Sequence, residues 1–153
     1  MEAVAREAGV GKGTLYRRFG DRAGLARSVF EERERALQEE LIRGPAPLGP
    51  GAPAIDRLRA FGHAYLDFLD CVAPMLALAE LSLAAGDGPY GFYHLHVRVL
   101  LQEAAPDGDA ELLAHMLLAT LSAAKHVTLR ERHGIDLARR KDVWDQLVRG
   151  CCG

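Results

Sequence analysis

The chain opens with MEAVAREAGVGKGTLYRRFGDR (residues 1–22), a stretch that has the arrangement of a helix-turn-helix. Such a unit needs small residues where its two helices cross, glycine at the turn and apolar residues on the inward faces. The sequence supplies them at Val4, Ala5, Ala8, Gly9, Val10 and Leu15. Gly9 permits a positive φ, and Gly11 loosens the same turn. We therefore predict two short helices, of which the second begins near Gly13.

The second of these helices presents polar and basic side chains on its outward face. They are Lys12, Thr14, Tyr16, Arg17 and Arg18. Hydroxyl and guanidinium groups bind phosphate oxygens and base edges, and a single helix fits into the major groove of DNA. The sequence therefore predicts a helix that contacts nucleic acid.

Local charge agrees with this prediction. Residues 6–27 contain six basic and two acidic side chains, a balance of +4, whereas the whole chain has a formal charge of −2. The rest of the chain therefore carries −6, and a basic head on an acidic body directs the approach to DNA. The alternative interpretation is an ordinary solvated helix face that happens to carry arginines.

The stretch from Val4 to Arg22 resembles the DNA-binding segment of the TetR family of one-component transcriptional regulators. The Thr14-Leu15-Tyr16 triplet, the aromatic Phe19 and the basic Arg22 stand where that family has them. The resemblance implies a homodimer with an N-terminal head that reads a double-stranded DNA operator and a helical body that binds a small molecule. The expected function is a repressor that a largely apolar effector releases from its operator. The expected DNA contacts are Lys12, Gly13, Thr14, Tyr16, Arg17, Arg18 and Arg22.

One departure from the family concerns the start of the sequence. In the family a further helix precedes the motif and covers its back, whereas here Met1 stands where the motif's own first helix begins. Val4, Leu15 and Leu25 would then lose part of their burial, which is worth about 1.5–3 kcal/mol for a side chain of this size. Two explanations are open: a start codon assigned too far downstream, or a shortened protein with a loose head. In the second case the chain is a helical ligand-binding and dimerisation protein that no longer binds DNA by itself.

Helical periodicity fills the rest of the chain, and alternating strand patterns are missing, so the predicted fold class is all-α with about eight helices. A segment rich in proline and glycine, residues 44–53, cannot continue a helix and is predicted to be a linker. It divides a head with its connecting helix (1–43) from a helical ligand-binding and dimerisation body (54–153). The expected helices after the helix-turn-helix cover residues 21–43, 55–73, 74–85, 90–105, 110–132 and 137–149, with a break at 86–89.

Two sets of residues in the body are candidates for binding. Aromatic and polar side chains that could line a mostly apolar ligand cavity are Phe61, Tyr65, Phe68, Met75, Phe92 and His96. Apolar side chains on the last two helices that could form a dimer interface are Leu113, Leu117, Leu121, Trp144 and Leu147. In each case the alternative is ordinary packing within one chain, which a single sequence does not distinguish from binding.

Other functions have less support in the sequence. His94 and His96 point about 200° apart on a helix, so we expect no shared metal ion. The histidines are scattered and no nucleophile is paired with a base, so we expect neither an enzyme nor a cofactor. Three cysteines, two of them adjacent at Cys151 and Cys152, form no disulfide framework. The apolar runs are far shorter than the roughly 18 residues of a membrane span, so we expect a cytoplasmic protein that enters no membrane.

Overall fold

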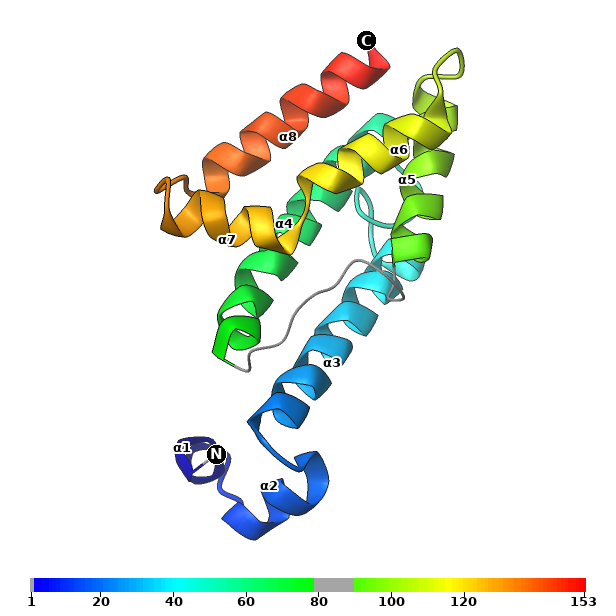
Figure 1. Cartoon of the computed structure of the whole chain (residues 1–153). Coiled ribbons are helices and arrows are strands. Elements are labelled where there is room, and N and C mark those ends of the chain that lie inside the picture. Colours follow the sequence, from blue (N-terminus) through cyan, green and yellow to red (C-terminus); the bar gives the residue numbers. More distant parts are fainter. Residues whose placement is uncertain (1, 79–89) are drawn as a thin grey trace.

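A computed structural model describes residues 2–78 and 90–153, with the backbone alone for residues 74–78. Within these residues the chain forms eight helices and no strand, so the predicted all-α fold class is confirmed (Figure 1). The expected break at residues 86–89 lies outside the described residues. The helices are α1 (Glu2–Glu7), α2 (Lys12–Phe19), α3 (Arg22–Arg43), α4 (Ala54–Leu78), α5 (Tyr90–Ala104), α6 (Ala110–Thr120), α7 (Ala123–Glu131) and α8 (Leu137–Cys152).

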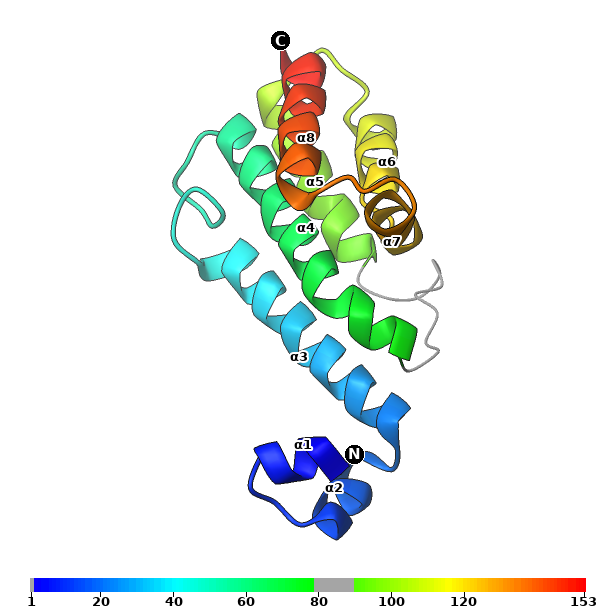
Figure 2. The same ribbon diagram turned by 90° about the vertical axis from the view of Figure 1, so that its left-hand side faces the viewer.

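Helices α1 and α2 and the first turns of α3 lie together at one end of the molecule (Figure 1, Figure 2). The chain turns between α1 and α2 at Gly9, whose φ of 64° is a positive value that glycine permits. Each of the three helices buries one apolar residue of this head: Ala5, Leu15 and Ala26. Because only the leucine is large, the core of the head is small.

Helix α3 connects the head to the body. Its N-terminus is capped by Asp21, whose Oδ1 accepts a hydrogen bond from the backbone N–H of Gly24 at 2.8 Å. Near its other end Leu37 and Leu41 are buried in the core of the body. Figure 2 shows α3 beside α4, and the linker joins their ends. One continuous helix therefore belongs to both parts of the molecule.

Helix α4 is the central helix of the body and packs against α3, α5, α7 and α8. One of its close neighbours is Trp144 of α8, which is 2% exposed. A Cβ atom at Gly62 would lie 1.9 Å from Cε2 of this indole, so the two helices approach this closely only because residue 62 is glycine. The indole N–H donates to the carbonyl oxygen of Leu58 at 3.0 Å. The only tryptophan of the chain is therefore a core residue.

Charged groups also link α8 to α4. Nη2 of Arg59 donates to Oδ2 of Asp145 at 2.8 Å, and Nε2 of His63 lies 2.9 Å from Oδ1 of the same carboxylate. The hydrogen bond from Arg59 holds the pKa of Asp145 below its usual value, so this mostly buried carboxylate stays ionised.

Pro74 does not begin a new helix, contrary to the prediction. Helix α4 runs through it to Leu78. Proline costs the helix the hydrogen bond to the carbonyl four residues earlier, but its fixed φ is compatible with helical backbone. Val72 and Ala73, immediately before it, are fully buried or nearly so, and this packing favours continuation of the helix.

The single helix expected over residues 110–132 is also wrong, because the structure has two helices there. The break falls at Leu121 and Ser122, and Ser122 has the extended backbone of an N-cap. Its hydroxyl oxygen accepts from the backbone N–H of Lys125 at 3.5 Å. Serine competes for backbone groups in this way and favours helix ends over helix interiors.

No single helix among the described residues is long and apolar enough to cross a membrane. Helices α6 and α7 taken together have the length and apolar composition of a membrane span, but their axes are bent by 40° at the break between them.

Candidate nucleic-acid interface and cavity

Helix α2 presents its polar side chains to solvent. Leu15 is buried and Phe19 half-buried, and these two residues attach the helix to the rest of the head. All seven residues predicted to contact DNA are exposed: Lys12, Gly13, Thr14, Tyr16, Arg17, Arg18 and Arg22. The structure thus brings them together on α2 and on the first residue of α3.

Two of the basic side chains are held by neighbours within the head. Lys12 pairs with Glu2 of α1, and its ammonium also lies 5.9 Å from the centre of the Tyr16 ring. The guanidinium of Arg18 lies 5.4 Å from the centre of the Phe19 ring. Lys12 must therefore leave, or share, a carboxylate partner to contact a phosphate. Arg17 has no such partner among the described residues and extends from the exposed face.

The apolar faces of the head are unevenly covered. Val4 is 43% exposed and Val10 is 40% exposed, whereas Leu15 is buried and Leu25 is half-buried. Of the three residues expected to lose cover, Val4 is open, Leu25 is half-buried, and Leu15 is buried, contrary to the expectation.

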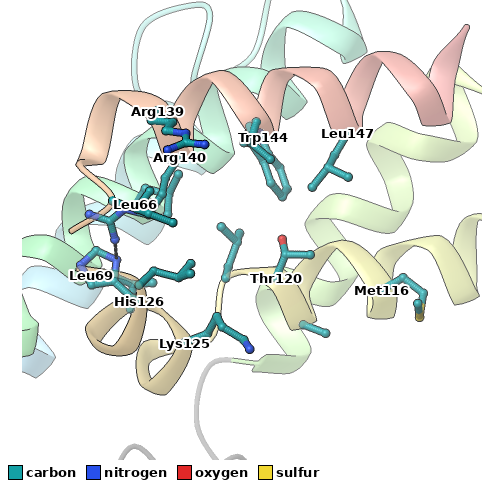
Figure 3. Close-up of a pocket in the computed structure, with 15 residues that line it drawn as sticks. Leu66, Leu69, Met116, Thr120, Lys125, His126, Arg139, Arg140, Trp144 and Leu147 are labelled. Carbon is teal, nitrogen blue, oxygen red and sulfur yellow. Dashed lines mark hydrogen bonds between the residues drawn. The ribbon is translucent and has the colours of Figure 1, made fainter. Parts of the chain in front are cut away.

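A cavity of about 560 Å³ lies in the body between α4, α6, α7 and α8. Figure 3 shows Trp144 and Leu147 reaching from α8 toward Thr120 of α6 across this space. Its lining is mostly apolar, and the volume falls within the range of small-molecule sites. The lining residues are Leu66, Leu69, Met116, Ala119, Thr120, Leu121, Lys125, His126, Leu129, Ile135, Arg139, Arg140, Val143, Trp144 and Leu147.

One end of the cavity carries a buried polar group, His126, which is 3% exposed (Figure 3). Nη1 of Arg140 donates to Nδ1 of His126 at 2.6 Å, so the ring must carry its proton on Nε2 and donate it to Asp70 Oδ1, 3.2 Å away. Burial lowers the pKa of His126, and the Arg140 cation lowers it further. Nη2 of Arg140 is buried and has no hydrogen-bond partner, although Asp70 Oδ1 lies 3.6 Å away. Thr120, Lys125 and Arg139 also line the cavity, so hydrogen-bond donors are present among its mostly apolar walls.

The residues that the sequence proposed as ligand-binding lie elsewhere. Phe61, Tyr65 and Phe68 of α4 meet the α5 residues Phe92 and His96 in an aromatic cluster that also includes Tyr93 and Phe30. None of them lines the 560 Å³ cavity. The side chain of Met75 lies outside the described residues. A ligand at this cluster stays a prediction, and the cavity was missed because its walls meet only in the folded chain.

The residues proposed for the dimer interface divide into two groups. Leu117, Leu121 and Trp144 are buried within one chain, whereas Leu113 is half-buried and Leu147 is 38% exposed. Their neighbours Leu112, Met116 and Val143 are more exposed than any of the five. The helices proposed for the interface therefore do carry an open apolar face, although the dimer itself stays a prediction.

The structure also brings together three side chains that the sequence did not connect. His96 points into the aromatic cluster, as the 200° separation from His94 requires, while His94 meets Glu111 and His115 of α6. One ligand atom from each of the three lies within 4.8 Å of the other two. The spacing of Glu111 and His115, four residues apart, is the only part of this group that the sequence could have revealed.

Comparison with known proteins gives one match, on the head. Residues 1–29 match the family model of bacterial regulatory proteins of the tetR family. No curated protein and no solved structure matches the chain. The matched stretch covers α1, α2 and the first third of α3, and it includes all seven of the predicted DNA contacts.

Proposed function

We propose that this chain, whose residues 1–29 match the tetR family model, is a TetR-family homodimeric repressor that a small molecule releases from its DNA operator. The family match implies a DNA-binding transcriptional regulator and dimerisation. The observation that carries the proposal is the exposed face of α2, on which hydroxyl, phenol and guanidinium groups stand together in the matched segment.

Within this proposal the exposed residues have two different tasks. Thr14 and Tyr16 lie on α2 and reach base edges in the major groove. Arg22 is the first residue of α3, where a cation next to a helix N-terminus suits a phosphate contact that fixes position. Loss of the first kind of contact changes sequence preference, and loss of the second kind weakens all DNA alike.

The test begins with the selection of duplexes from a random library by the purified chain, followed by fluorescence anisotropy titrations. Thr14→Ala and Tyr16→Ala should each weaken binding to the selected duplex by about 1–3 kcal/mol and leave binding to a scrambled duplex unchanged. Arg22→Ala should weaken both, and should reduce the slope of log affinity against log salt by about 1 per subunit.

Arg149→Ala is the matched control, because Arg149 is an exposed arginine near the far end of α8. It should leave both affinities unchanged. An Arg22→Ala variant that loses sequence preference but keeps its affinity for scrambled DNA would show that the two tasks are assigned to the wrong residues. Failure to enrich any sequence would favour the alternative, a helical ligand-binding and dimerisation protein that does not bind DNA by itself.

The effector is a largely apolar small molecule with a hydrogen-bond acceptor at one end. Support comes from the mostly apolar lining of the 560 Å³ cavity and from the cationic donors of Lys125 and Arg139 among its lining residues.

The dimer forms through the open faces of α6 and α8. Met116 is 62% exposed, and it lines the same cavity mouth as Val143 and Leu147. Light scattering at micromolar concentration should give twice the 16.7 kDa mass of one chain. Met116→Asp together with Leu147→Asp should give the mass of a monomer, because a second copy would then have to desolvate two charges per subunit.

Leu95→Asp is the control for the dimer, since Leu95 is an equally open leucine on α5. It should leave the mass unchanged. A monomer mass for the unaltered chain, or dissociation by Leu95→Asp alone, would contradict this interface.

A further inference from the structure

We propose that His94, Glu111 and His115 form a binding site for a divalent transition-metal ion, with Zn²⁺ as the expected occupant. The site lies between α5 and α6 and outside both the DNA-binding head and the 560 Å³ cavity. It does not depend on the repressor role proposed above.

Three potential ligand atoms converge at this site. Nε2 of His94 also lies 3.4 Å from the backbone carbonyl oxygen of Glu111, a contact that a bound metal ion would replace. Nε2 of His94 lies 3.7 Å from Oε1 of Glu111, and Nε2 of His115 lies 3.9 Å from the same oxygen. In tetrahedral zinc sites the ligand atoms stand 2.0–2.1 Å from the metal, which places them about 3.3 Å from one another. The two nitrogens therefore need to approach the carboxylate oxygen by only about 0.4–0.6 Å on that geometry.

Two neighbouring side chains hold these ligands in position. Oη of Tyr90 lies 2.5 Å from Nδ1 of His115, which leaves Nε2 of that ring facing Glu111. Nη1 of Arg98 donates to Oε2 of Glu111 at 3.1 Å, which leaves Oε1 facing the two histidines. Hydrogen bonds to the remote atoms of ligating histidines and carboxylates are the usual support of a metal site.

The donor set favours zinc over the hard cations. Two imidazoles and one carboxylate are ligands of catalytic-type zinc sites, which have three protein ligands and a water molecule. Ca²⁺ and Mg²⁺ prefer oxygen ligands throughout. His115 is about half exposed, so an ion can reach the site from solvent, and His94 is mostly buried, so the site is anchored in the body.

Cobalt titration of the full chain tests the proposal, because the absorption of Co²⁺ reports the geometry and the ligands. The expected result is one Co²⁺ per chain with tetrahedral d–d bands and no thiolate charge-transfer band, displaced by one equivalent of Zn²⁺. Zn²⁺ should also raise the thermal unfolding temperature, because a ligand that binds the folded state stabilises it.

Three variants with one control assign the ligands. Tyr90→Phe removes only an outer hydrogen bond and should weaken Zn²⁺ binding by roughly 10–100-fold. His115→Ala and Glu111→Gln remove a ligand and should weaken it further, and the glutamine variant keeps the size of the side chain if the alanine variant fails to fold. His133→Ala, which removes an exposed histidine after α7, should leave the affinity unchanged.

The free cysteines provide the competing explanation, since Cys151 and Cys152 are adjacent thiols. Cobalt bands that include thiolate charge transfer and disappear in Cys151→Ser/Cys152→Ser would overturn the proposal. Zn²⁺ binding that is unchanged in Glu111→Gln, or no binding at micromolar concentration, would also overturn it.

Discussion

Replacing Trp144 with alanine should lower the free energy of unfolding by about 3–5 kcal/mol, the cost of removing a large buried aromatic side chain. Trp144 is the largest of the fully buried side chains. The centre of its ring lies 6.2 Å from the centre of the Phe61 ring, in an edge-on arrangement. The measurement is urea-induced unfolding followed by circular dichroism at one fixed protein concentration. Fluorescence does not serve, because the variant has no tryptophan.

Two further variants separate the contributions at this site. Trp144→Phe keeps an aromatic ring and loses the hydrogen bond to Leu58, a bond worth about 1 kcal/mol, so it should cost clearly less than alanine. Gln146→Ala, at an exposed position of the same helix, should change stability by no more than about 0.5 kcal/mol. A loss below about 1 kcal/mol for Trp144→Ala would show that the indole is not a core residue.

The substitution Gly62→Ala should destabilise the chain by about 1–3 kcal/mol, the usual cost of overpacking a core. The added Cβ would lie 1.9 Å from Cε2, 2.0 Å from Nε1 and 2.3 Å from Cδ2 of Trp144, so α4 and α8 must move apart. This loss occurs although alanine is the better helix former by about 1 kcal/mol.

The sign of the Gly62→Ala effect should reverse when Trp144 is already alanine. Without the indole the three atoms nearest to the new methyl group are gone, so the gain in helix propensity, up to about 1 kcal/mol, should dominate. A double-mutant cycle from the same urea titrations measures this coupling. Equal losses in the two backgrounds would mean that the indole is not what requires glycine at position 62.

The head was predictable because its determinants are local. A glycine turn, the spacing of small residues and the basic outward face all lie within residues 1–22, and the structure realises each of them. The start of α3 at Arg22 and the linker were predictable for the same reason, since Asp21 is a cap and the closely spaced prolines and glycines of residues 44–53 exclude helix.

Features of the body depended on contacts between distant segments. The pattern of α8 shows that Trp144 lies on an apolar face, but not whether that face meets α4 or another subunit. Gly62 stands 82 positions earlier and gives no signal without its partner. The cavity likewise requires the break at Ser122, because an unbroken helix would not bring Lys125 and Thr120 to the same space.

The metal-binding cluster illustrates the same limit. The sequence correctly predicted that the side chains of His94 and His96 point in different directions. The partners of His94, however, lie 17 and 21 positions later in the chain, on another helix. Only the Glu111–His115 pair has a spacing that indicates a shared helix face.

Under the proposed function, the continuity of α3 has a mechanical consequence for a signal that passes from the body to DNA. Its 22 residues span roughly 33 Å, with Leu41 anchored at one end and the cap at Asp21 next to α2 at the other. Such a rod acts as a lever: a tilt of about 6° at the anchored end swings the far end by ~3.4 Å, the rise of one base along a DNA strand. A small rearrangement in the body could therefore shift α2 by a distance equal to one base-pair step.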